Sequence, residues 1–506
     1  MDRPPVWPMD ARGAALTVRR LFQIALAVLL LLLPRLAHAH VGNKDVFEEV
    51  HAGPYTLNVT VRPPNVIPGV ATIEVRSSGP EVRTIAITPV PMVGEASKHP
   101  PTADPMAHSL SDPAFFTGSL WLMATGSWKV AFAVSGAAGP AQASVPVPAL
   151  ALSMLRMNRP LGLLLGALGL LLVVGVAGIV FAATGEARLR PGVQPDAPRR
   201  RRAWVMAGVA LVTVCAAVWA GGVWWNVEAA DYADRVFQPL QLTPSLTGDT
   251  LHLTVGSYVN AERPYRSRLN NDLLPDHGHL MHLYAIREPQ MDVAFHLHPA
   301  PTAPGELAME MPQMPAGRYR LFGDIVHRSG FPETLTATLE VPQGFHGGAL
   351  SPEDASAAAA PISAGELGTT FRLPDGYSMT WDRPAPLQAG QPARFRFTLL
   401  DAQGRPATDT VPYLGMAGHA AFVKTDFSAF AHTHPEGSAP MQSVEVANEG
   451  GGVGDMAAMS ASNASSVIPP TVEFPYGFPS SGRYRIFVQM KHGATVETGV
   501  FDADVK

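Results

Sequence analysis

Two uninterrupted apolar runs divide the chain into three parts. Leu161–Ala183 and Ala203–Trp225 each contain 23 residues and no charged side chain. At a rise of about 1.5 Å per residue, a helix of this length crosses the hydrocarbon core of a bilayer. The segment between the runs carries six arginines, so the positive-inside rule places residues 185–202 in the cytoplasm and both flanking parts on the exported side. We therefore predict transmembrane helices over 159–184 and 203–225.

Outside these runs, apolar and polar residues alternate over short stretches that are separated by proline- and glycine-rich turns. Alternation with a period of two is typical of β-strands with one buried face. The part before the first span contains six such runs: Tyr55–Arg62, Val70–Arg76, Val82–Val90, Ser119–Met123, Trp128–Val134 and Ala141–Val147. An immunoglobulin-like β-sandwich over residues 40–158 is the natural way to close this many strands.

The part after the second span is an internal duplication. A Gly-His-Leu-Met-His stretch that ends at His282 precedes the His-x-His pair of His296 and His298, and a Gly-Arg-Tyr-Arg strand then leads to His327. The matching positions in the second copy are His419, His432, His434 and His492. Duplication at this level of detail predicts two related domains.

We place the two copies, as further immunoglobulin-like sandwiches, at residues 226–342 and 365–506. A Gly/Ala/Ser/Pro-rich linker is predicted over 343–364, and a flexible loop over 437–466. The predicted fold class is thus mainly β, with three β-sandwich domains and two transmembrane helices.

The amino-terminal 39 residues have the features of a secretory signal peptide. A basic stretch precedes a core of 13 mostly apolar residues, Leu21–Leu33, and Ala37-His38-Ala39 is a small-x-small cleavage site. Cleavage there would make His40 the first residue of the mature protein. The alternative is an uncleaved membrane anchor.

Composition and motifs exclude several kinds of binding and catalysis. The net charge of −5 gives no electrostatic basis for binding nucleic acid. The single cysteine, Cys215, excludes an intrachain disulfide and a cysteine-based metal site. Phosphate-binding glycine loops, nucleophile elbows and the His-Glu-x-x-His pattern are all missing from the sequence, so we expect a binding protein and not an enzyme.

The paired histidines are the strongest candidate ligands. Residues two apart on a strand point to the same side, so each His-x-His pair offers two imidazoles on one face. A third nitrogen from His282 or His327, and from His419 or His492 in the second copy, would complete a site for copper or zinc. The alternative is that these histidines cap a sheet edge and hydrogen-bond to the backbone. Asp276, Asp324 and Asp426 could orient the imidazoles.

Methionines near the repeats favour copper over zinc. Thioethers are soft ligands that select Cu(I), and Met416 stands where the first copy has His279. Ordinary filling of core gaps is the alternative for these methionines. A mature His40 would offer its α-amine and Nδ1 to Cu(II), with Asp45, His51, His99 or His108 completing the site.

Three resemblances add to these expectations. The amino-terminal domain resembles the YtkA-like and FixH-like family of exported bacterial domains through Gly53-Pro54-Tyr55, the Pro63–Gly69 turn and Gly118–Val130. A mature start at histidine resembles CopC-like copper-resistance proteins of immunoglobulin fold. The whole arrangement resembles a group of bacterial membrane proteins that carry Asp276–His282 and Phe295–Pro299. These resemblances imply copper handling at the outer face of a bacterial inner membrane.

We therefore predict an inner-membrane protein whose exported sandwiches bind or relay copper. Its expected partners are the lipid bilayer and another copper protein or membrane complex. Two alternatives stay open. One is a metal-free scaffold or assembly factor for a membrane complex, and the other is a mononuclear copper oxidoreductase with an open coordination position.

Overall fold

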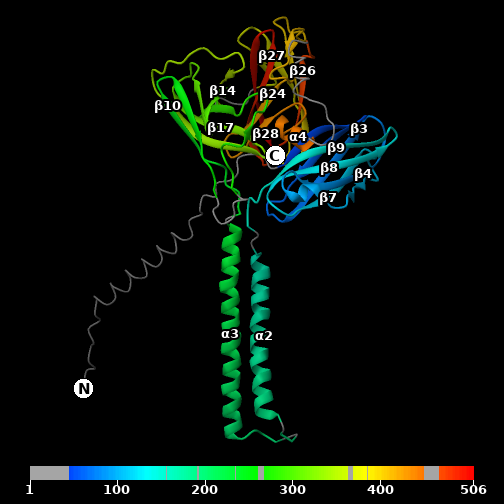
Figure 1. The fold of residues 1–506 in the computed structure, drawn as a ribbon, viewed down its shortest axis with the longest axis vertical. Helices are drawn as coiled ribbons and strands as arrows, with labels where there is room; N and C mark the ends of the chain where they lie inside the picture. The colour runs from blue at the N-terminus through cyan, green and yellow to red at the C-terminus, as the bar shows by residue number, and fades with distance from the viewer. Residues whose placement is uncertain are drawn as a thin grey trace, which may run out of the picture. The chain divides into compact units, whose positions relative to one another are not determined.

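The computed structural model describes residues 45–506 except 155–156, 188, 191–192, 234, 260–266, 363–367, 385 and 449–466. The predicted signal segment and His40 lie outside the described residues. The described residues confirm a mainly β fold, with six antiparallel sheets and two long helices (Figure 1).

Two sheets form the amino-terminal domain. One has the strand order β1-β2-β3-β7-β6 and the other β5-β4-β8-β9. Their bounds are β1 (Val46–Ala52), β2 (Tyr55–Arg62), β3 (Gly69–Ser78), β4 (Val82–Pro91), β5 (Asp104–Pro105), β6 (Ala107–His108), β7 (Phe115–Leu122), β8 (Gly126–Gly136) and β9 (Gly139–Ala149), with the short 3-10 helix η1 (Glu95–Lys98) after β4. The inward residues of both sheets share one hydrophobic core, as a sandwich requires.

Two apolar helices follow. Helix α2 (Arg159–Glu186) has 28 residues and α3 (Ala197–Ala233) has 37, and they run side by side (Figure 1). Both are long and apolar enough to cross a membrane by length and composition. Their apolar side chains are largely exposed, unlike those of a helix in a soluble core.

The first repeat domain contains strands β10 to β19. A sheet of order β10-β11-β16-β15 packs on one of order β12-β17-β13-β14-β19, and β18 also pairs with β17. The bounds are β10 (Leu242–Thr247), β11 (Thr250–Val255), β12 (Leu273–Leu274), β13 (His282–Arg287), β14 (Val293–Leu297), β15 (Ala300–Ala303), β16 (Glu306–Glu310), β17 (Gly317–His327), β18 (Pro332–Val341) and β19 (Ala355–Ala358). Strand β19 lies in the segment expected to be only a linker, and it extends the sheet by pairing with β14.

The second repeat domain is built in the same way. Sheet β20-β21-β22-β26 packs on sheet β23-β27-β24-β25, and β28 pairs with β27. The bounds are β20 (Thr370–Arg372), β21 (Ser378–Asp382), β22 (Pro392–Leu400), β23 (Thr410–Val411), β24 (His419–Lys424), β25 (Phe430–Thr433), β26 (Thr471–Gly477), β27 (Gly482–His492) and β28 (Thr495–Val505). Part of the predicted flexible loop is helical, as α4 (Met441–Asn448).

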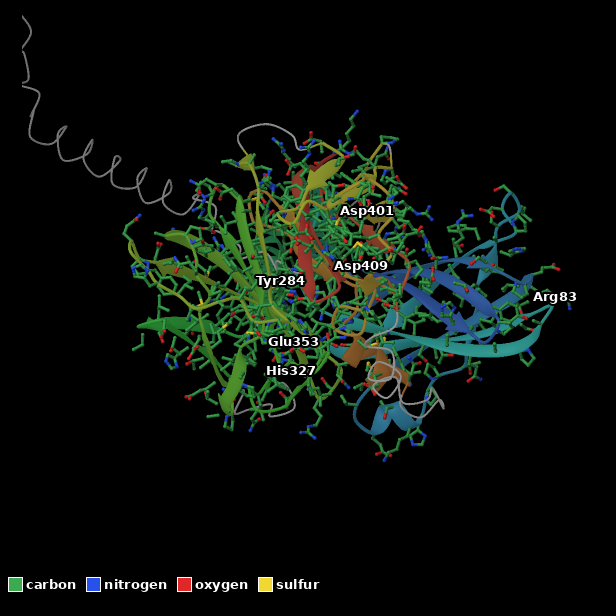
Figure 2. All side chains as sticks on the ribbon, turned by 90° about the horizontal axis from the view of Figure 1, so that it is seen from above. Arg83, Tyr284, His327, Glu353, Asp401 and Asp409 are labelled. Atoms are coloured by element: carbon green, nitrogen blue, oxygen red, sulfur yellow. The ribbon has the colours of Figure 1, made fainter. Side chains whose placement is uncertain are left out.

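The two repeat domains pack against each other, although each has a hydrophobic core of its own. A hydrophobic cluster joins Tyr284, Ile286 and Phe322 of the first domain to Phe430 and Phe487 of the second. Figure 2 labels Tyr284 within this contact. Strands β13, β14 and β24 are buried on both faces, one against their own sandwich and one against the neighbouring domain.

Candidate metal centre

A duplicated tight turn introduces both His-bearing strands. The backbones of Asp276 and His279 pair across one turn, and those of Tyr413 and Met416 pair across the other. The central residues have positive φ in both copies: 50° and 88° at His277 and Gly278, and 50° and 81° at Leu414 and Gly415. A type I′ turn requires this conformation at both central positions, which explains the X-Gly pair in each copy.

Eight histidines among the described residues gather where the two repeat domains meet. We call this group the histidine cluster; its members are His277, His279, His282, His296, His298, His419, His432 and His434. The expected sharing of a face within each pair is confirmed, since ring centroids lie 4.5 Å apart for His296 and His298 and 4.7 Å apart for His432 and His434. In the first copy His282, His296 and His298 come together as expected, whereas in the second copy His419 and His434 are joined by His277 of the first.

Within the cluster, His282, His296 and His298 form the first trio. His282 Nδ1 lies 3.1 Å from His296 Nε2 and 3.2 Å from His298 Nε2. Ligand nitrogens bound tetrahedrally at about 2.0–2.1 Å from an ion would be roughly 3.3–3.4 Å apart. Both separations from His282 Nδ1 are therefore already close to the spacing that a metal ion imposes, and ligand atoms of all three residues lie within 4.8 Å of one another.

The outward nitrogen of each ring in the first trio meets an acceptor. The acceptors are the Asp276 carbonyl for His282 at 3.1 Å, Gln489 Oε1 for His296 at 2.9 Å, and Asp354 Oδ1 for His298 at 2.9 Å. These oxygens cannot donate, so each outward nitrogen must carry the N–H of its imidazole. A neutral imidazole has only one N–H, so when all three rings are neutral the three inward nitrogens are bare lone pairs. Ligating histidines are held by outward hydrogen bonds of this kind.

Burial disfavours the charged form of four rings of the cluster. It lowers the pKa of His282 and His296 well below the usual range, and neighbouring histidines lower it further. The same causes act in the same order on the pKa of His419 and His434. Lone pairs that converge with no proton between them repel one another, and a cation at their centre removes that repulsion.

His277, His419 and His434 form a second trio. Their ring centroids make a nearly equilateral triangle with sides of 5.2, 5.1 and 5.1 Å. His277 Nε2, His434 Nε2 and both nitrogens of His419 are buried without a hydrogen-bond partner among the described residues. Buried polar atoms are rarely left unpaired, so these atoms also point to a ligand. The first repeat domain contributes His277, and this trio therefore exists only when the domains are in contact.

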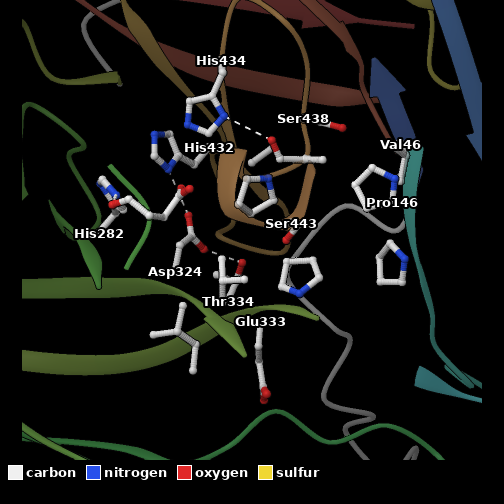
Figure 3. A pocket seen from close by; sticks show the side chains of 18 of the residues that line it. Val46, Pro146, His282, Asp324, Glu333, Thr334, His432, His434, Ser438 and Ser443 are labelled. Carbon is white, nitrogen blue, oxygen red and sulfur yellow. Dashed lines mark hydrogen bonds and ion pairs between the residues drawn. The ribbon is translucent and has the colours of Figure 1, made fainter. Parts of the chain in front are cut away.

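His432 lies between the two trios. Its ring centroid is 5.3 Å from that of His282, 5.4 Å from those of His296 and His419, and 4.7 Å from that of His434. Its Nδ1 lies 3.4 Å from Asp324 Oδ2, while its Nε2 is buried and has no hydrogen-bond partner in the part of the chain that the structure describes. Asp324 in turn accepts a hydrogen bond from Thr334 (Figure 3).

The orienting contacts of the cluster are exchanged between the domains. Asp324 of the first domain meets His432 of the second, while Gln489 of the second meets His296 of the first. Asp324 and Gln489 occupy equivalent register positions, opposite His282 and His419. This reciprocity reflects the equivalent positions of Asp324 and Gln489 in the two copies.

His327 and His492 do not join the cluster, which corrects the predicted ligand set. His282 pairs with Asp324 in the ladder, so residues an even number of positions from Asp324 share its face. His327 is three positions away and points to the opposite, core face with Leu321 and Ile325. There it pairs with Asp272 and Glu333 at 2.8 and 3.1 Å, which raise its pKa against the effect of burial. The same parity separates His492 from His419, whose ladder partner is Gln489.

The other predicted ligands also lie elsewhere. Met281, Met311 and Met314 belong to the core of the first repeat domain, and Met490 to that of the second, so they fill core gaps. Met416 is buried beside its turn. The histidines expected to assist His40 are not together, because β1, with His51, and β6, with His108, are opposite edges of one sheet. Asp426 bonds to Ser428 in its own turn.

Sequence reasoning missed four residues of the centre. His277 and His279 were detectable, since they form a third His-x-His, with ring centroids of His279 and His298 4.2 Å apart. Asp354 and Gln489 gave no local signal, because Asp354 lies in the expected linker and Gln489 in the other domain.

A cavity of about 90 Å³ reaches the edge of the cluster. His282, His432 and His434 line it together with Val46 and Pro146 of the amino-terminal domain (Figure 3). Sites for organic ligands usually measure about 300–1,000 Å³. This cavity suits water or a small ion, and an organic substrate would not fit.

These features define a polyhistidine centre between two duplicated β-sandwiches. In sequence, the chain is similar over residues 245–343 and 370–506 to the family described as "Domain of unknown function (DUF8832)". The match covers both repeats; the resemblance of the amino-terminal domain to YtkA-like and FixH-like domains stays a prediction. A comparison with curated proteins gave no match.

Solved structures show only distant likenesses. A tetra-tandem repeat in the extending region of a large adhesion protein is 9% identical, with 89% of this chain and 74% of that chain covered and a TM-score of 0.16. The native conformation of Escherichia coli alpha-2-macroglobulin is 8% identical, with 93% and 23% covered and a TM-score of 0.19. TM-scores this low carry no argument about function.

Proposed function

We propose that this chain is a membrane-anchored copper-binding protein of the exported side of a bacterial inner membrane. The observation that carries the proposal is the first trio. The inward nitrogens of His296 and His298 lie 3.1 and 3.2 Å from His282 Nδ1, while all three outward nitrogens face oxygen acceptors. A hydrogen-bonded edge cap would not leave three bare lone pairs pointing at one another.

Copper is favoured by the donor set. An all-imidazole site takes copper, zinc, nickel or iron, and affinity among divalent ions of the first row is highest for Cu²⁺. The soft thioether argument for Cu(I) does not support the choice, because the methionines belong to the cores. We expect one copper ion in the first trio and a second in the second trio, with His432 able to bind either.

Binding or relay of copper is favoured over catalysis. The cluster is buried, and the cavity beside it is too small for an organic substrate. Helices α2 and α3, with the arginines between them, would anchor the domains and place them on the exported side. The partner would be a copper donor or acceptor that exchanges the ion through this cavity.

The test is copper loading of the full-length protein in detergent, with the bound copper per chain measured by mass spectrometry after removal of excess metal. We expect two copper ions in the wild type and about one in the double variant His296→Gln/His298→Gln. His327→Gln should keep both ions, since His327 pairs with carboxylates outside the cluster. X-ray absorption should show nitrogen ligands at about 2.0 Å with no sulfur. Absence of copper, or equal loss in the His327 control, would overturn the proposal, and preferential retention of zinc would replace copper in it.

A further inference from the structure

A second group of ligand-type side chains lies in the second repeat domain, away from the histidine cluster. It contains Asp375, Asp409, His492 and Glu497. His492 ends β27, Glu497 is on the paired strand β28, Asp409 directly precedes β23, and Asp375 lies in the turn between β20 and β21. One ligand atom each of Asp375, His492 and Glu497 lies within 4.8 Å of the others.

The imidazole of His492 is aimed into this group. The residue is 8% exposed, and its ring stacks on Tyr377 with centroids 4.0 Å apart. Nδ1 faces Asp409 Oδ2 at 3.3 Å. Nε2 lies 2.8 Å from Asp375 Oδ2 in an ion-pair contact, and the described residues offer Nε2 no hydrogen-bond partner. A buried imidazole nitrogen that faces carboxylate oxygens without a hydrogen bond is placed to act as a metal ligand beside them.

Glu497 is the second buried member of the group. It is 7% exposed, and no hydrogen bond or ion pair links its carboxylate to the rest of the described chain.

In the first repeat domain, protein side chains alone neutralise the charges of the equivalent group. There His327 occupies the position of His492 and Asp272 that of Asp409, with Nδ1–Oδ1 at 2.8 Å. Glu333 bonds His327 Nε2, and Arg268 pairs with Glu333 at 2.8 Å. Two carboxylates thus meet one imidazole and one guanidinium.

The second domain has a different balance of charge. Three carboxylates, those of Asp375, Asp409 and Glu497, surround His492. Among the described residues, no arginine or lysine forms an ion pair with any of the three. In the first copy, the guanidinium of Arg268 supplies the second positive charge. In the second copy, a bound metal ion would take its place.

We propose that Asp375, His492 and Glu497 bind a divalent metal ion that is distinct from the copper of the histidine cluster. Asp409 acts as a positioning residue, since it accepts the Nδ1–H of His492 and so directs Nε2 toward the ion. Two carboxylates and one imidazole form an oxygen-rich donor set of the kind used by Mn²⁺ and Zn²⁺. The site stands on residues outside the cluster and does not depend on the proposed copper binding.

Mn²⁺ is the probe that separates the two sites. It is the weakest binder in the divalent series, so the all-imidazole cluster competes poorly for it. Metal-stripped full-length protein in detergent is titrated with Mn²⁺, and free Mn²⁺ is counted by its electron paramagnetic resonance signal. We expect one saturable Mn²⁺ per chain, with nitrogen modulation from one imidazole in spin-echo spectra. Zn²⁺ added afterwards should displace it, as zinc stands higher in the affinity order.

Variants decide between this site and a merely structural cluster. Glu497→Gln keeps the side-chain shape and should weaken Mn²⁺ binding at least tenfold. Asp375→Asn, at an exposed position, should do the same, which covers the case in which the Glu497 variant fails to fold. Asp272→Asn, the matched change in the first copy, and His296→Gln/His298→Gln should leave Mn²⁺ binding unchanged. No saturable binding, binding without the nitrogen signature, or unchanged affinity in Asp375→Asn would overturn the proposal.

Discussion

Substitution of Asp354 by asparagine tests how the first trio is held. Asp354 is 5% exposed, and its Oδ1 accepts hydrogen bonds from both His298 Nδ1, at 2.9 Å, and the His298 backbone N–H, at 3.1 Å. Asparagine has nearly the same shape and can still accept through its amide oxygen. The variant therefore removes the negative charge behind the imidazole while the ring stays in place.

The expected loss of copper affinity is about 10- to 100-fold, the usual effect of removing a partner that orients a ligating histidine. Each factor of ten corresponds to about 1.4 kcal/mol, so the loss is about 1.4–2.8 kcal/mol. The charge matters because a carboxylate makes the imidazole a stronger electron donor to the metal. Its burial strengthens this effect by limiting the screening from water.

The assay is a copper titration of the full-length protein against a chelator of known affinity, on wild type and variant at one pH. Asp272→Asn is the matched control, because Asp272 makes the same contact with His327, which faces away from the cluster. We expect the control to keep wild-type copper affinity even if it loses stability. Equal affinity of wild type and Asp354→Asn, or an equal loss in both variants, would refute the reasoning.

Three further substitutions test other features of the structure. Arg485→Met should cost about 3–5 kcal/mol in urea unfolding, because it removes both hydrogen bonds from Arg485 to the buried Asp502 carboxylate, which keeps its longer contact with Arg483, and also removes the bonds to Met291 and Ala360 of the other domain. The partly exposed counterpart Arg320→Met should cost about 0–1 kcal/mol. Equal costs would contradict the burial argument. Burial raises the pKa of Glu48 well above its usual value of 4.5. Above pH 4.5 the folded state therefore holds a proton that the unfolded chain releases. The free energy of unfolding should then fall as the pH rises from about 4.5 through the folded pKa. In thermal melts from pH 5 to 8, Glu48→Gln should lack this part of the decline, and parallel curves would contradict it. Gly418→Ala should weaken the contact of β24 with β27, because its Cβ would lie 2.5 Å from the Gln489 carbonyl oxygen. The control Gly348→Ala has open space around its Cβ and should match the wild type in copper stoichiometry and in thermal melting.

Much of the local arrangement could be predicted from the sequence. The Gly-Arg-Tyr-Arg strands end at His327 and His492 as the duplication indicated. The paired histidines share a face because the two-residue period of a strand is a property of the backbone itself. His282 and His419 lie on the strands next to those pairs, since short hairpins keep neighbouring segments together. Each of these outcomes depends on residues less than about twenty positions apart.

The ligand set itself could not be predicted in this way. His327 was expected beside His298, but the odd spacing from Asp324 directs it to the core face, and this parity is known only once the register of β13 and β17 is known. One sequence signal was available and unused. Strands β13 and β24 have apolar residues on both faces, as in His282–Ile286 and His419–Val423, a pattern that indicates a second covering layer.

The sequence by itself determined the duplication, the strands and the two imidazoles that each strand presents on one face, because these follow from backbone geometry over a few residues. Only the tertiary structure decided that the two sets of imidazoles face each other and that Gln489 and Asp324 cross between domains to hold them. It also decided that His277 completes a trio with His419 and His434. These contacts join residues more than a hundred positions apart through the packing of two sheet faces, and the register of that packing depends on the side chains of both domains together.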